Sequence, residues 1–355
     1  MKIAVYTIAL NEIKHCERWA NSVADADYRV VLDTGSTDGT VEKLRELGVT
    51  VFEQRFDPWR FDHARNSALA CVPDDAEICI SQDMDEFLAD GWRSKMTAAW
   101  HAGETTRLAY TYVFDYRDGE NNTGFRMDKI HARSGYEWKR PVHETVFNTT
   151  GREVIAEDLS IALNQIQDRS KGTRSNYLPL MAIATREDPM DSQLSFWYGR
   201  ELMYANQHSE AVAELNRYLD LETSRWPVER SEAMLYISRM SDSRKLEYIQ
   251  RALICSPERR QVWLELARYY YNIQDWHGLL WACGSGMERS RRDHSYLDHT
   301  DAWGNQLLDF GAIAAANLGW YTRAADWCQQ ALDMQPTDDR LKNNLQWMQS
   351  KIKEQ

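Results

Sequence analysis

The chain has 355 residues, of which 43% are hydrophobic, and its formal net charge is -12. This length favours two domains, and the acidic balance argues against a protein that binds nucleic acid or anionic lipid without specificity. The six cysteines lack the spacing of zinc ligands or of a disulfide framework, and no apolar run approaches the roughly 20 residues that cross a bilayer. We therefore expect a cytoplasmic protein without a membrane span.

The first half of the chain alternates short β-branched runs with helical patterns. Strands are predicted at KIAVYTIAL (2–10), YRVVLD (28–33), VTVFEQ (49–54) and EICISQD (77–83). Helices are predicted between them, at residues 11–24, 39–48 and 60–71. This alternation predicts a doubly wound α/β domain with helices on both faces of the sheet. In such sheets ligands bind beyond the carboxyl ends of the strands, so the loops that follow the four strands are expected to meet at one crevice.

The pattern changes after Trp92 to further strand-like runs. They are TRLAYTYVFDY (106–116), FRMDKIHAR (125–133), YEWKRPVHETVF (136–147) and EVIAEDLSIAL (153–163), and we expect them to flank the sheet. The polar stretch QDRSKGTRSN (167–176) then leads into a helical second half. The predicted division is an α/β domain at 1–170, a linker and first helix at 171–190, and a helical repeat domain at 191–355.

The second half repeats with a period of 34 residues, which separates Gly199, Ala233 and Ala267. Each is a small residue flanked by large apolar ones, and this period is typical of tetratricopeptide-like (TPR-like) helix pairs. The last unit resembles the tetratricopeptide pattern around Ala312, which lies 45 residues after Ala267, so about 11 residues are inserted, with ERSRRDHSYLD (288–298) as the candidate segment. We interpret the aromatic and alanine residues as packing between helices, with one face of the repeats open to a partner.

Three carboxylates, Asp83, Asp85 and Glu86, follow the fourth predicted strand. An EF-hand loop is excluded, because Phe87 and Leu88 stand where a ligand and a glycine are required. The acids could open a solvated helix, since acidic residues are favourable in a first helical turn. They could also hold Mg²⁺ or Mn²⁺, because hard carboxylate oxygens suit these ions.

A second motif, VVLDTGSTDGT (30–40), favours the metal site. It follows a strand, carries Gly35 and Gly39 in a tight turn and opens a helix, so it can bring backbone N–H groups and Asp33 close to a nucleotide. It lacks the GxGxxG spacing of nicotinamide-binding loops and the GxxxxGK[ST] pattern of a P-loop.

Four motifs together resemble the family 2 glycosyltransferases of the GT-A fold. They are TIALNE (7–12), VVLDTGSTDGT (30–40), FDHARNSAL (61–69) and ISQDMDEFL (80–88), in this order. The resemblance covers about residues 1–165, and the fusion to TPR-like helices is similar to a known subgroup. It implies a Rossmann-like, mixed GT-A sheet followed by all-α repeats, and a hexosyl or pentosyl transferase that uses a nucleotide-sugar, typically a UDP-sugar, with Mn²⁺ or Mg²⁺.

The resemblance also implies roles for residues on the donor side. The nucleotide base and ribose would be lined by Thr7, Ala9, Asn11, Glu12 and Asp33, with Asp33 accepting a hydrogen bond from the base. Arg65 would neutralise the diphosphate or help to bind the ribose, a task that suits its fork of donors. In the Asp-x-Asp (DxD) motif, Asp85 would ligate the metal between the phosphates and Asp83 would contact the ribose, sugar or metal. Glu86 would complete the acidic site.

On the acceptor side, the resemblance implies an inverting single displacement that needs one carboxylate base. Glu144 in KRPVHETVF is the first candidate, with Asp115 and Asp118 as rivals. His143 would be a third metal ligand or a diphosphate contact. Two alternatives stay open: Glu144 could pair with a neighbouring basic residue, and His143 could be a half-buried, hydrogen-bonded imidazole.

One departure and two alternatives qualify this hypothesis. Related sequences often carry a histidine near the end of the last strand, where this chain has Asn164, which weakens the expected metal site. The predicted acceptor is a protein, peptide or glycan presented by the repeats, through which copies of the chain could also associate. A nucleic-acid acceptor on the basic segments PERRQ (257–261) and ERSRRD (288–293), or a non-catalytic repeat scaffold, would be the alternatives.

Overall fold

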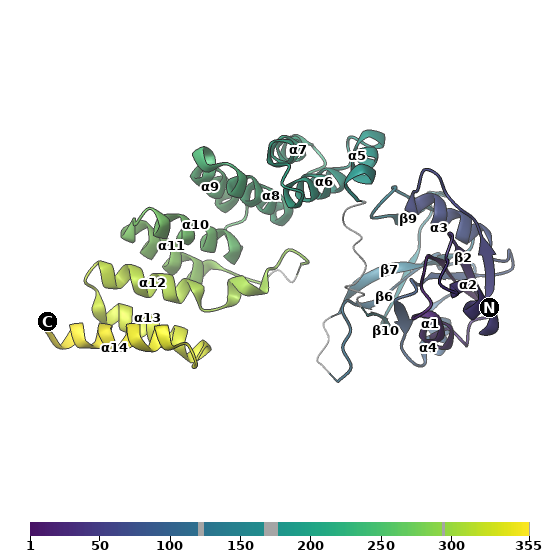
Figure 1. Cartoon of the computed structure of the whole chain (residues 1–355), viewed down its shortest axis with the longest axis horizontal. Helices are drawn as coiled ribbons and strands as arrows, with labels where there is room; N and C mark the ends of the chain where they lie inside the picture. Colours follow the sequence, from purple (N-terminus) through teal and green to yellow (C-terminus); the bar gives the residue numbers. More distant parts are fainter. Residues whose placement is uncertain (120–123, 167–176, 293–294, 355) are drawn as a thin grey trace. The chain divides into compact units, whose positions relative to one another are not determined.

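The structure, a computed structural model, describes residues 1–119, 124–166, 177–292 and 295–354 (Figure 1). These residues form two compact units, Met1–Ala184 and Thr185–Gln355. The first part of the predicted linker, residues 171–176, lies outside the described residues.

The N-terminal unit contains an eight-stranded mixed sheet with the strand order β3-β2-β1-β4-β7-β6-β10-β5. Its strands are β1 (Ile3–Ala9), β2 (Tyr28–Asp33), β3 (Thr50–Glu53), β4 (Ile78–Ser81), β5 (Glu86–Leu88), β6 (Arg107–Val113), β7 (Gly124–Ala132) and β10 (Ile155–Gln165). Strands β3, β2, β1 and β4 are parallel, so their carboxyl ends meet at one edge. Strands β7 and β5 run antiparallel to their neighbours, which makes the sheet mixed.

Both faces of the sheet are covered, because successive side chains of a strand point to opposite faces. The helices are α1 (Cys16–Ser22), α2 (Thr40–Glu46), α3 (Phe61–Ala70) and α4 (Trp92–Ala99). Ile3 and Val5 of β1 pack in one core with side chains of α1, α2 and α4. Ala4 and Tyr6 pack in a second core with α3 and with a separate two-stranded sheet, β8 (Tyr136–Lys139) and β9 (Thr145–Asn148). The predicted doubly wound α/β fold is confirmed.

Two details differ from the sequence analysis. Strands β7, β6 and β10 do not merely flank the parallel strands, since they continue the same sheet beside β4. The acids at 83–86 do not open a helix: Glu86–Leu88 form β5, which pairs with the end of β10, and α4 begins only at Trp92. Gly91 in the left-handed region, with φ of 76°, lets the chain turn into that helix.

The second unit is helical. Its helices are α6 (Ser192–Tyr204), α7 (His208–Asp220), α8 (Pro227–Met240), α9 (Lys245–Cys255), α10 (Arg260–Asn272), α11 (Trp276–Arg289), α12 (Gln306–Asn317), α13 (Tyr321–Met334) and α14 (Asp339–Glu354). The helix α5 (Tyr177–Glu187) contains the division between the two units. The helices pack as consecutive pairs, α6 with α7 through α12 with α13, and this confirms the predicted helix-pair repeats.

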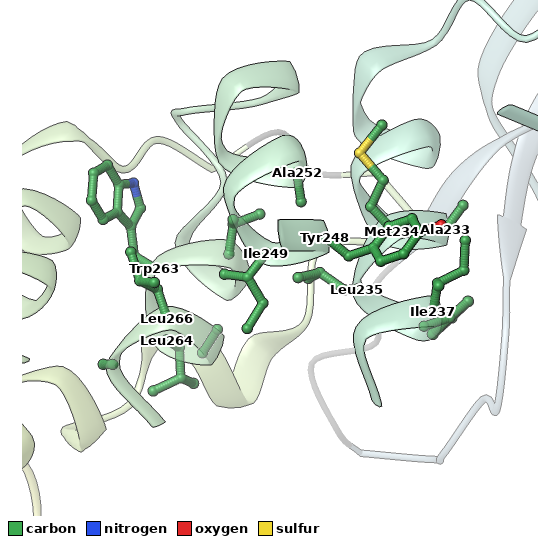
Figure 2. Close-up of a cluster of buried hydrophobic side chains, with 14 of the residues drawn as sticks. Ala233, Met234, Leu235, Ile237, Tyr248, Ile249, Ala252, Trp263, Leu264 and Leu266 are labelled. Carbon is green, nitrogen blue, oxygen red and sulfur yellow. The ribbon is translucent and has the colours of Figure 1, made fainter. Parts of the chain in front are cut away.

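Small residues let the repeats pack closely. Gly199, Ala233 and Ala267 lie on α6, α8 and α10, the first helix of three successive pairs, and all three are buried. A Cβ atom added to Gly199 would lie 2.6 Å from Cγ of Leu215 on α7, so a larger residue would separate this pair. Figure 2 shows the apolar core that α8, α9 and α10 share.

The inserted segment before the last pair lies between α11 and α12, and its residues 293 and 294 are outside the described part of the chain. The carbonyl oxygen of Leu297 accepts hydrogen bonds from Arg259 (2.9 Å) and from Gln261 (2.9 Å). The hydroxyl of Tyr296 donates to Glu229 of α8 (2.9 Å). The insertion is therefore docked on α8 and on the start of α10. None of the helices in the described residues combines the length and apolar character that crossing a bilayer requires.

Candidate active site

The loops after β1 and β2 are joined by side-chain hydrogen bonds. Asn11, in the left-handed region with φ of 56°, accepts from the N–H of Thr37 (2.8 Å), and its own N–H donates to Ser36 Oγ (2.7 Å). Asp33 is buried and accepts from the N–H groups of Gly35 and Ser36 (both 2.8 Å). Asn11 and Asp33, the predicted nucleotide contacts, thus also fix the conformation of the loop after β2.

A cavity of about 170 Å³ lies at this edge of the sheet. It is lined by Asp33, Gly35, Ser36, Glu53, Gln54 and Arg55. Gly35 has φ of 122°, a conformation that other residues rarely adopt. Thr7 and Ala9 are buried at the carboxyl end of β1, where Ala9 pairs with Asp33 at the end of β2.

Arg65 of α3 brings the two sides of the predicted site together. Its Nη1 and Nη2 donate to the two carboxylate oxygens of Asp83 (2.8 and 3.1 Å), and its Nε donates to Glu144 (2.5 Å). The side chain of Arg65 is 6% exposed, against 32% for Asp83 and 12% for Glu144. Burial opposes ionisation of Asp83, but Arg65 and Lys129 outweigh it and lower the pKa of Asp83 to about 2. Arg65 therefore holds Asp83 in its charged form and pairs with Glu144 at the same time.

Trp138, which the sequence analysis missed, supports Arg65 and is itself held by Tyr6 and Asn66. The ring of Trp138 lies 4.9 Å from the Arg65 guanidinium carbon, a cation–π contact. Trp138 in turn donates through Nε1 to Tyr6 (2.8 Å), whose hydroxyl contacts Nε2 of His131 (2.9 Å). Asn66 pairs with both the N–H and the carbonyl oxygen of Trp138 (2.8 Å each). Arg65 and Asn66 of FDHARNSAL thus have separate tasks: Arg65 pairs with the two carboxylates, and Asn66 fixes β8.

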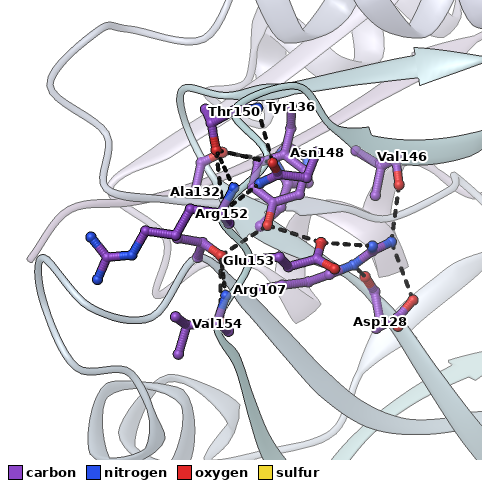
Figure 3. A network of polar contacts seen from close by, with 12 residues as sticks. Arg107, Asp128, Ala132, Tyr136, Val146, Asn148, Thr150, Arg152, Glu153 and Val154 are labelled. Carbon is purple, nitrogen blue, oxygen red and sulfur yellow. Dashed lines mark hydrogen bonds and ion pairs between the residues drawn. The ribbon is translucent and has the colours of Figure 1, made fainter.

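The hairpin of β8 and β9 presents Glu144 at the end of a tight turn. Arg140 and His143 in this turn have φ values of 81° and 51°, a conformation that costs about 1–3 kcal/mol for residues other than glycine. Figure 3 shows the network that anchors the hairpin: Arg107 of β6 donates to the carbonyl oxygen of Val146 (3.0 Å) and pairs with Glu153 (3.1 Å). The fold therefore stabilises an unfavourable backbone at the predicted base.

Asp85 has a different environment from Asp83. Nε2 of Gln165, the last residue of β10, donates to Asp85 Oδ2 (3.0 Å), and the N–H of Ile166 donates to the Asp85 carbonyl oxygen (3.0 Å). Burial, followed by the charge of Asp83, raises the pKa of Asp85 to about 6. Oε1 of Gln165 is buried and accepts no hydrogen bond from the described residues. Gln165, next to Asn164, is a site residue that the sequence analysis missed.

Glu86 does not face the same space as Asp83 and Asp85. It is buried, accepts the N–H of Asp83 (2.8 Å) and accepts the hydroxyl of Tyr112 (2.9 Å). Burial, followed by the charge of Asp83, raises the pKa of Glu86 to about 7. Its contacts give it a part in fixing the turn that carries Asp83.

Helix α1 contributes a basic side chain beside Asp85. Nη2 of Arg18 contacts Nδ1 of His15 (3.0 Å) and the carbonyl oxygen of Asp85 (3.3 Å). His15 in turn lies 3.9 Å from a carboxylate oxygen of Glu12. Arg18 lies in the expected helix 11–24 but belongs to no recognisable motif, which is why sequence reasoning passed over it.

Three predicted site residues remain: His143, Asp115 and Asp118. His143 stacks edge to face on Tyr177 of α5 (ring centroids 5.6 Å apart). Asp115 directly follows β6 and pairs with Arg117 (3.0 Å). Asp118 is exposed. Among the predicted bases, Glu144 is the one placed against Arg65, and through Arg65 it is joined to Asp83.

Asp83, Asp85 and His143 are the residues expected to hold a divalent cation. The described residues contain no group of three or more His, Cys, Asp or Glu side chains arranged to hold a metal, so Asp83, Asp85 and His143 do not form a ready cluster. Asp85 and the uncontacted oxygen of Gln165 remain as hard oxygen donors. Mg²⁺ and Mn²⁺ commonly take only one or two carboxylates and complete their shell with substrate phosphates and water. The residues around Asp85 fit such an ion.

The N-terminal unit is an α/β domain with a mixed sheet and with acidic residues where its parallel strands end. Residues 4–163 match the model of glycosyl transferase family 2, and the N-terminal domain belongs to that family. Glycosyl transfer is therefore the activity that this domain supports. The family match does not extend into the helical unit.

Several solved repeat structures are similar to this chain. MamA is 14% identical (TM-score 0.37), and the match covers 48% of this chain and 88% of MamA. YrrB, described as a TPR protein with an unusual peptide-binding site, is 14% identical (TM-score 0.36; 47% and 80% covered). A thermophilic TPR protein of Thermus thermophilus is 16% identical (TM-score 0.31; 50% and 91% covered). No curated protein matched the chain.

Proposed function

We propose that this protein is an inverting glycosyltransferase that uses a nucleotide-sugar donor, a UDP-sugar first among the candidates, and a divalent cation. The observation that carries the proposal is the ion-paired group of Asp83, Arg65 and Glu144, placed next to Asp85 where the parallel strands end. Three separate parts of the fold contribute to this arrangement: α3, the turn between β4 and β5, and the turn between β8 and β9. Its acids have unlike environments, as acid–base and binding roles require.

The nucleotide would lie against the ends of β1 and β2. The cavity beside Asp33 provides space there, and the loop of Gly35 and Ser36 supports a close approach of the ligand to the backbone. Thr7, Ala9, Asn11 and Glu12 would complete the binding site for the base and ribose. Asp33 can accept a base N–H only by sharing the oxygens that already hold its own turn.

Glu144 would act as the base that takes the proton of the acceptor nucleophile. The Arg65 contact keeps its carboxylate oriented, and the strained turn at His143 fixes the direction of approach. A carboxylate that is held in place in this way can remove a proton without first reorganising. Asp115 is the second candidate, because it follows β6 close to the end of β10.

Asp85 and Gln165 would hold Mn²⁺ or Mg²⁺. When bound, the cation offsets the charge of the leaving diphosphate. Asp83 would contact the ribose or the sugar through the oxygen lone pairs that Arg65 leaves open, and it could approach the ion as a further ligand. The ring of His143 packs against Tyr177. We therefore propose that His143 lies on the acceptor side of the site.

The acceptor would be a protein or peptide held by the helical repeats, or a glycan. Extended repeat surfaces commonly bind peptides, which supports the first of these. The repeats could also join two copies of the chain. A nucleic-acid acceptor receives less support, because Arg259 and Arg260 of the basic segment PERRQ are engaged with Glu232 and with the carbonyl oxygen of Ala302.

Donor hydrolysis tests the proposal directly. Purified protein is incubated with UDP-sugars and other common nucleotide-sugars, with and without Mn²⁺, beside the variant Asp85→Ala. We expect slow, Mn²⁺-dependent release of the nucleoside diphosphate, which the variant loses. If no donor is hydrolysed and no nucleotide raises the melting temperature, the enzyme proposal is wrong and a repeat scaffold with an inert α/β domain takes its place.

A further inference from the structure

We infer that Arg18 of α1 is the cationic residue that binds the diphosphate of the donor, a task that the family resemblance assigns to Arg65. The inference rests on the proposed use of a nucleoside-diphosphate sugar. It concerns which side chain of this protein receives the phosphates.

The guanidinium of Arg65 is already occupied by carboxylates and is not available to bind a diphosphate. All three of its donor nitrogens face carboxylates, two of them on Asp83 and one on Glu144. One positive charge against two negative charges leaves this group with a net charge of -1. If Arg65 turned to a phosphate, it would leave two largely buried carboxylates without their counter-ion, which is strongly unfavourable. Arg65 is better explained as the residue that positions Asp83 and Glu144.

Arg18 is in the opposite situation. Its Nη2 contacts neutral acceptors only, the imidazole of His15 and the carbonyl oxygen of Asp85. Within the described residues no carboxylate lies at ion-pair distance from it, and its Nε is buried without a hydrogen-bond partner. A half-buried guanidinium that forms no ion pair is stabilised when an anion binds beside it.

The position of Arg18 fits a phosphate better than a sugar or a base. It contacts the backbone of Asp85, whose side chain is the proposed cation ligand. It belongs to α1, the helix that follows the β1 loop with Asn11 and Glu12. The ring of Phe87 lies 5.8 Å from the guanidinium carbon and limits its movement on one side. A diphosphate that joins a nucleoside at the β1 loop to a cation at Asp85 would come within reach of this guanidinium.

The test measures phosphate and nucleoside binding separately. Dissociation constants are measured by calorimetry for UDP, GDP and TDP, and for uridine, guanosine and thymidine, in the presence of Mg²⁺. Arg18→Gln should weaken the binding of the preferred diphosphate by about tenfold or more, as loss of a charge-assisted contact predicts, and should leave the nucleoside unchanged. Arg18→Lys should keep part of the affinity. Arg93→Gln is the control. Arg93 of α4 pairs with Asp27, just before the start of β2, so its loss should change the affinity for neither the diphosphate nor the nucleoside.

The outcomes separate this inference from the proposed function. If the wild type binds a diphosphate and Arg18→Gln binds it equally well, the role of Arg18 is wrong while the donor class stands. If Arg18→Gln weakens the diphosphate and its nucleoside by the same factor at an unchanged melting temperature, Arg18 only fixes α1 against the Asp85 turn, and the inference is again overturned. If the wild type binds none of the three diphosphates, the proposed donor class fails together with it.

Discussion

Asp83 and Asp85 are two residues apart, yet the structure gives them opposite surroundings. Asp83 is matched by a buried arginine, and its pKa falls to about 2. The Asp85 carboxylate accepts a hydrogen bond from the neutral amide of Gln165, and burial raises its pKa to about 6. The first acid has a cationic partner in the protein, whereas within the described residues no basic side chain lies at ion-pair distance from the second. Variants on the two sides of the motif should therefore behave differently.

The largest effect on activity is expected at Glu144, which shares Arg65 with Asp83. The change Glu144→Gln keeps the shape of the side chain but removes the proton acceptor, so transfer should fall by about 10²–10⁴-fold. Nucleotide binding should stay the same, because the donor side is untouched. The measurement is single-turnover transfer beside a binding isotherm for UDP. Retention of full transfer activity would move the role of base to Asp115 or Asp118.

Removal of the shared counter-ion should cost the most stability. Arg65→Met leaves Asp83 and Glu144 facing each other without their partner, and we expect a loss of about 3–5 kcal/mol in the free energy of unfolding. Urea denaturation of the full chain measures it. The double variant Arg65→Met/Glu144→Gln should recover part of the loss, since one of the two charges is gone. No recovery would show that the loss comes from packing on Trp138.

The two acids of the motif should respond to amidation with opposite signs. Asp83→Asn should lower stability at pH 7 by about 1–2 kcal/mol, because the low pKa of the native group stabilises the fold above pH 4 and that gain disappears as the pH falls towards 2. Asp85 has a raised pKa, so its contribution declines as the pH rises from about 4 to about 6 and stays lost above that. Asp85→Asn should therefore raise metal-free stability at pH 7 by about 1–3 kcal/mol.

Thermal unfolding in EDTA between pH 4 and pH 8 measures both variants. The Asp85→Asn curve should approach that of the wild type near pH 4, whereas the Asp83→Asn curve should stay below it over the whole range, because the two converge only towards pH 2. If both variants are destabilised alike at pH 7, the difference between the two acids does not hold.

The smallest effect is expected at Gln165. The change Gln165→Met removes the amide beside Asp85 at nearly constant volume, so Mn²⁺ affinity should fall by about three- to tenfold, in line with one lost neutral contact of about 1 kcal/mol. Titration followed by the electron paramagnetic resonance of Mn²⁺ gives the dissociation constant without any assay of activity. Gln54→Met, on the β3 loop, is the control. An unchanged Mn²⁺ affinity would leave Asp85 as the sole protein ligand.

The sequence pattern predicted the parallel strands and the helix pairs, because each depends on a local period. The continuous apolar run of β1 and the 34-residue spacing of Gly199, Ala233 and Ala267 can both be read directly from the sequence. The three-residue strand β5 was missed, since a pairing this short is determined by the register of β10 and not by its own composition.

The site was only partly predictable for the same reason. Arg65 and Glu144 were each recognised from their motifs, but their contact spans 79 positions and depends on how the β8–β9 hairpin packs on α3. Gln165 meets Asp85 across 80 positions, through the pairing of β10 with β5. Arg18 belongs to no motif, and only the packing of α1 against the turn of Asp85 makes it a candidate.

The docked insertion changes how the helical unit should unfold. Stacked repeats normally touch only their immediate neighbours, and such arrays lose structure from an end, one unit at a time. Here a segment that follows α11 is bonded to Glu229 on α8, in the preceding pair, so the two pairs share a link besides their common interface. These central repeats should therefore melt as one cooperative block, flanked by end helices that can fray independently.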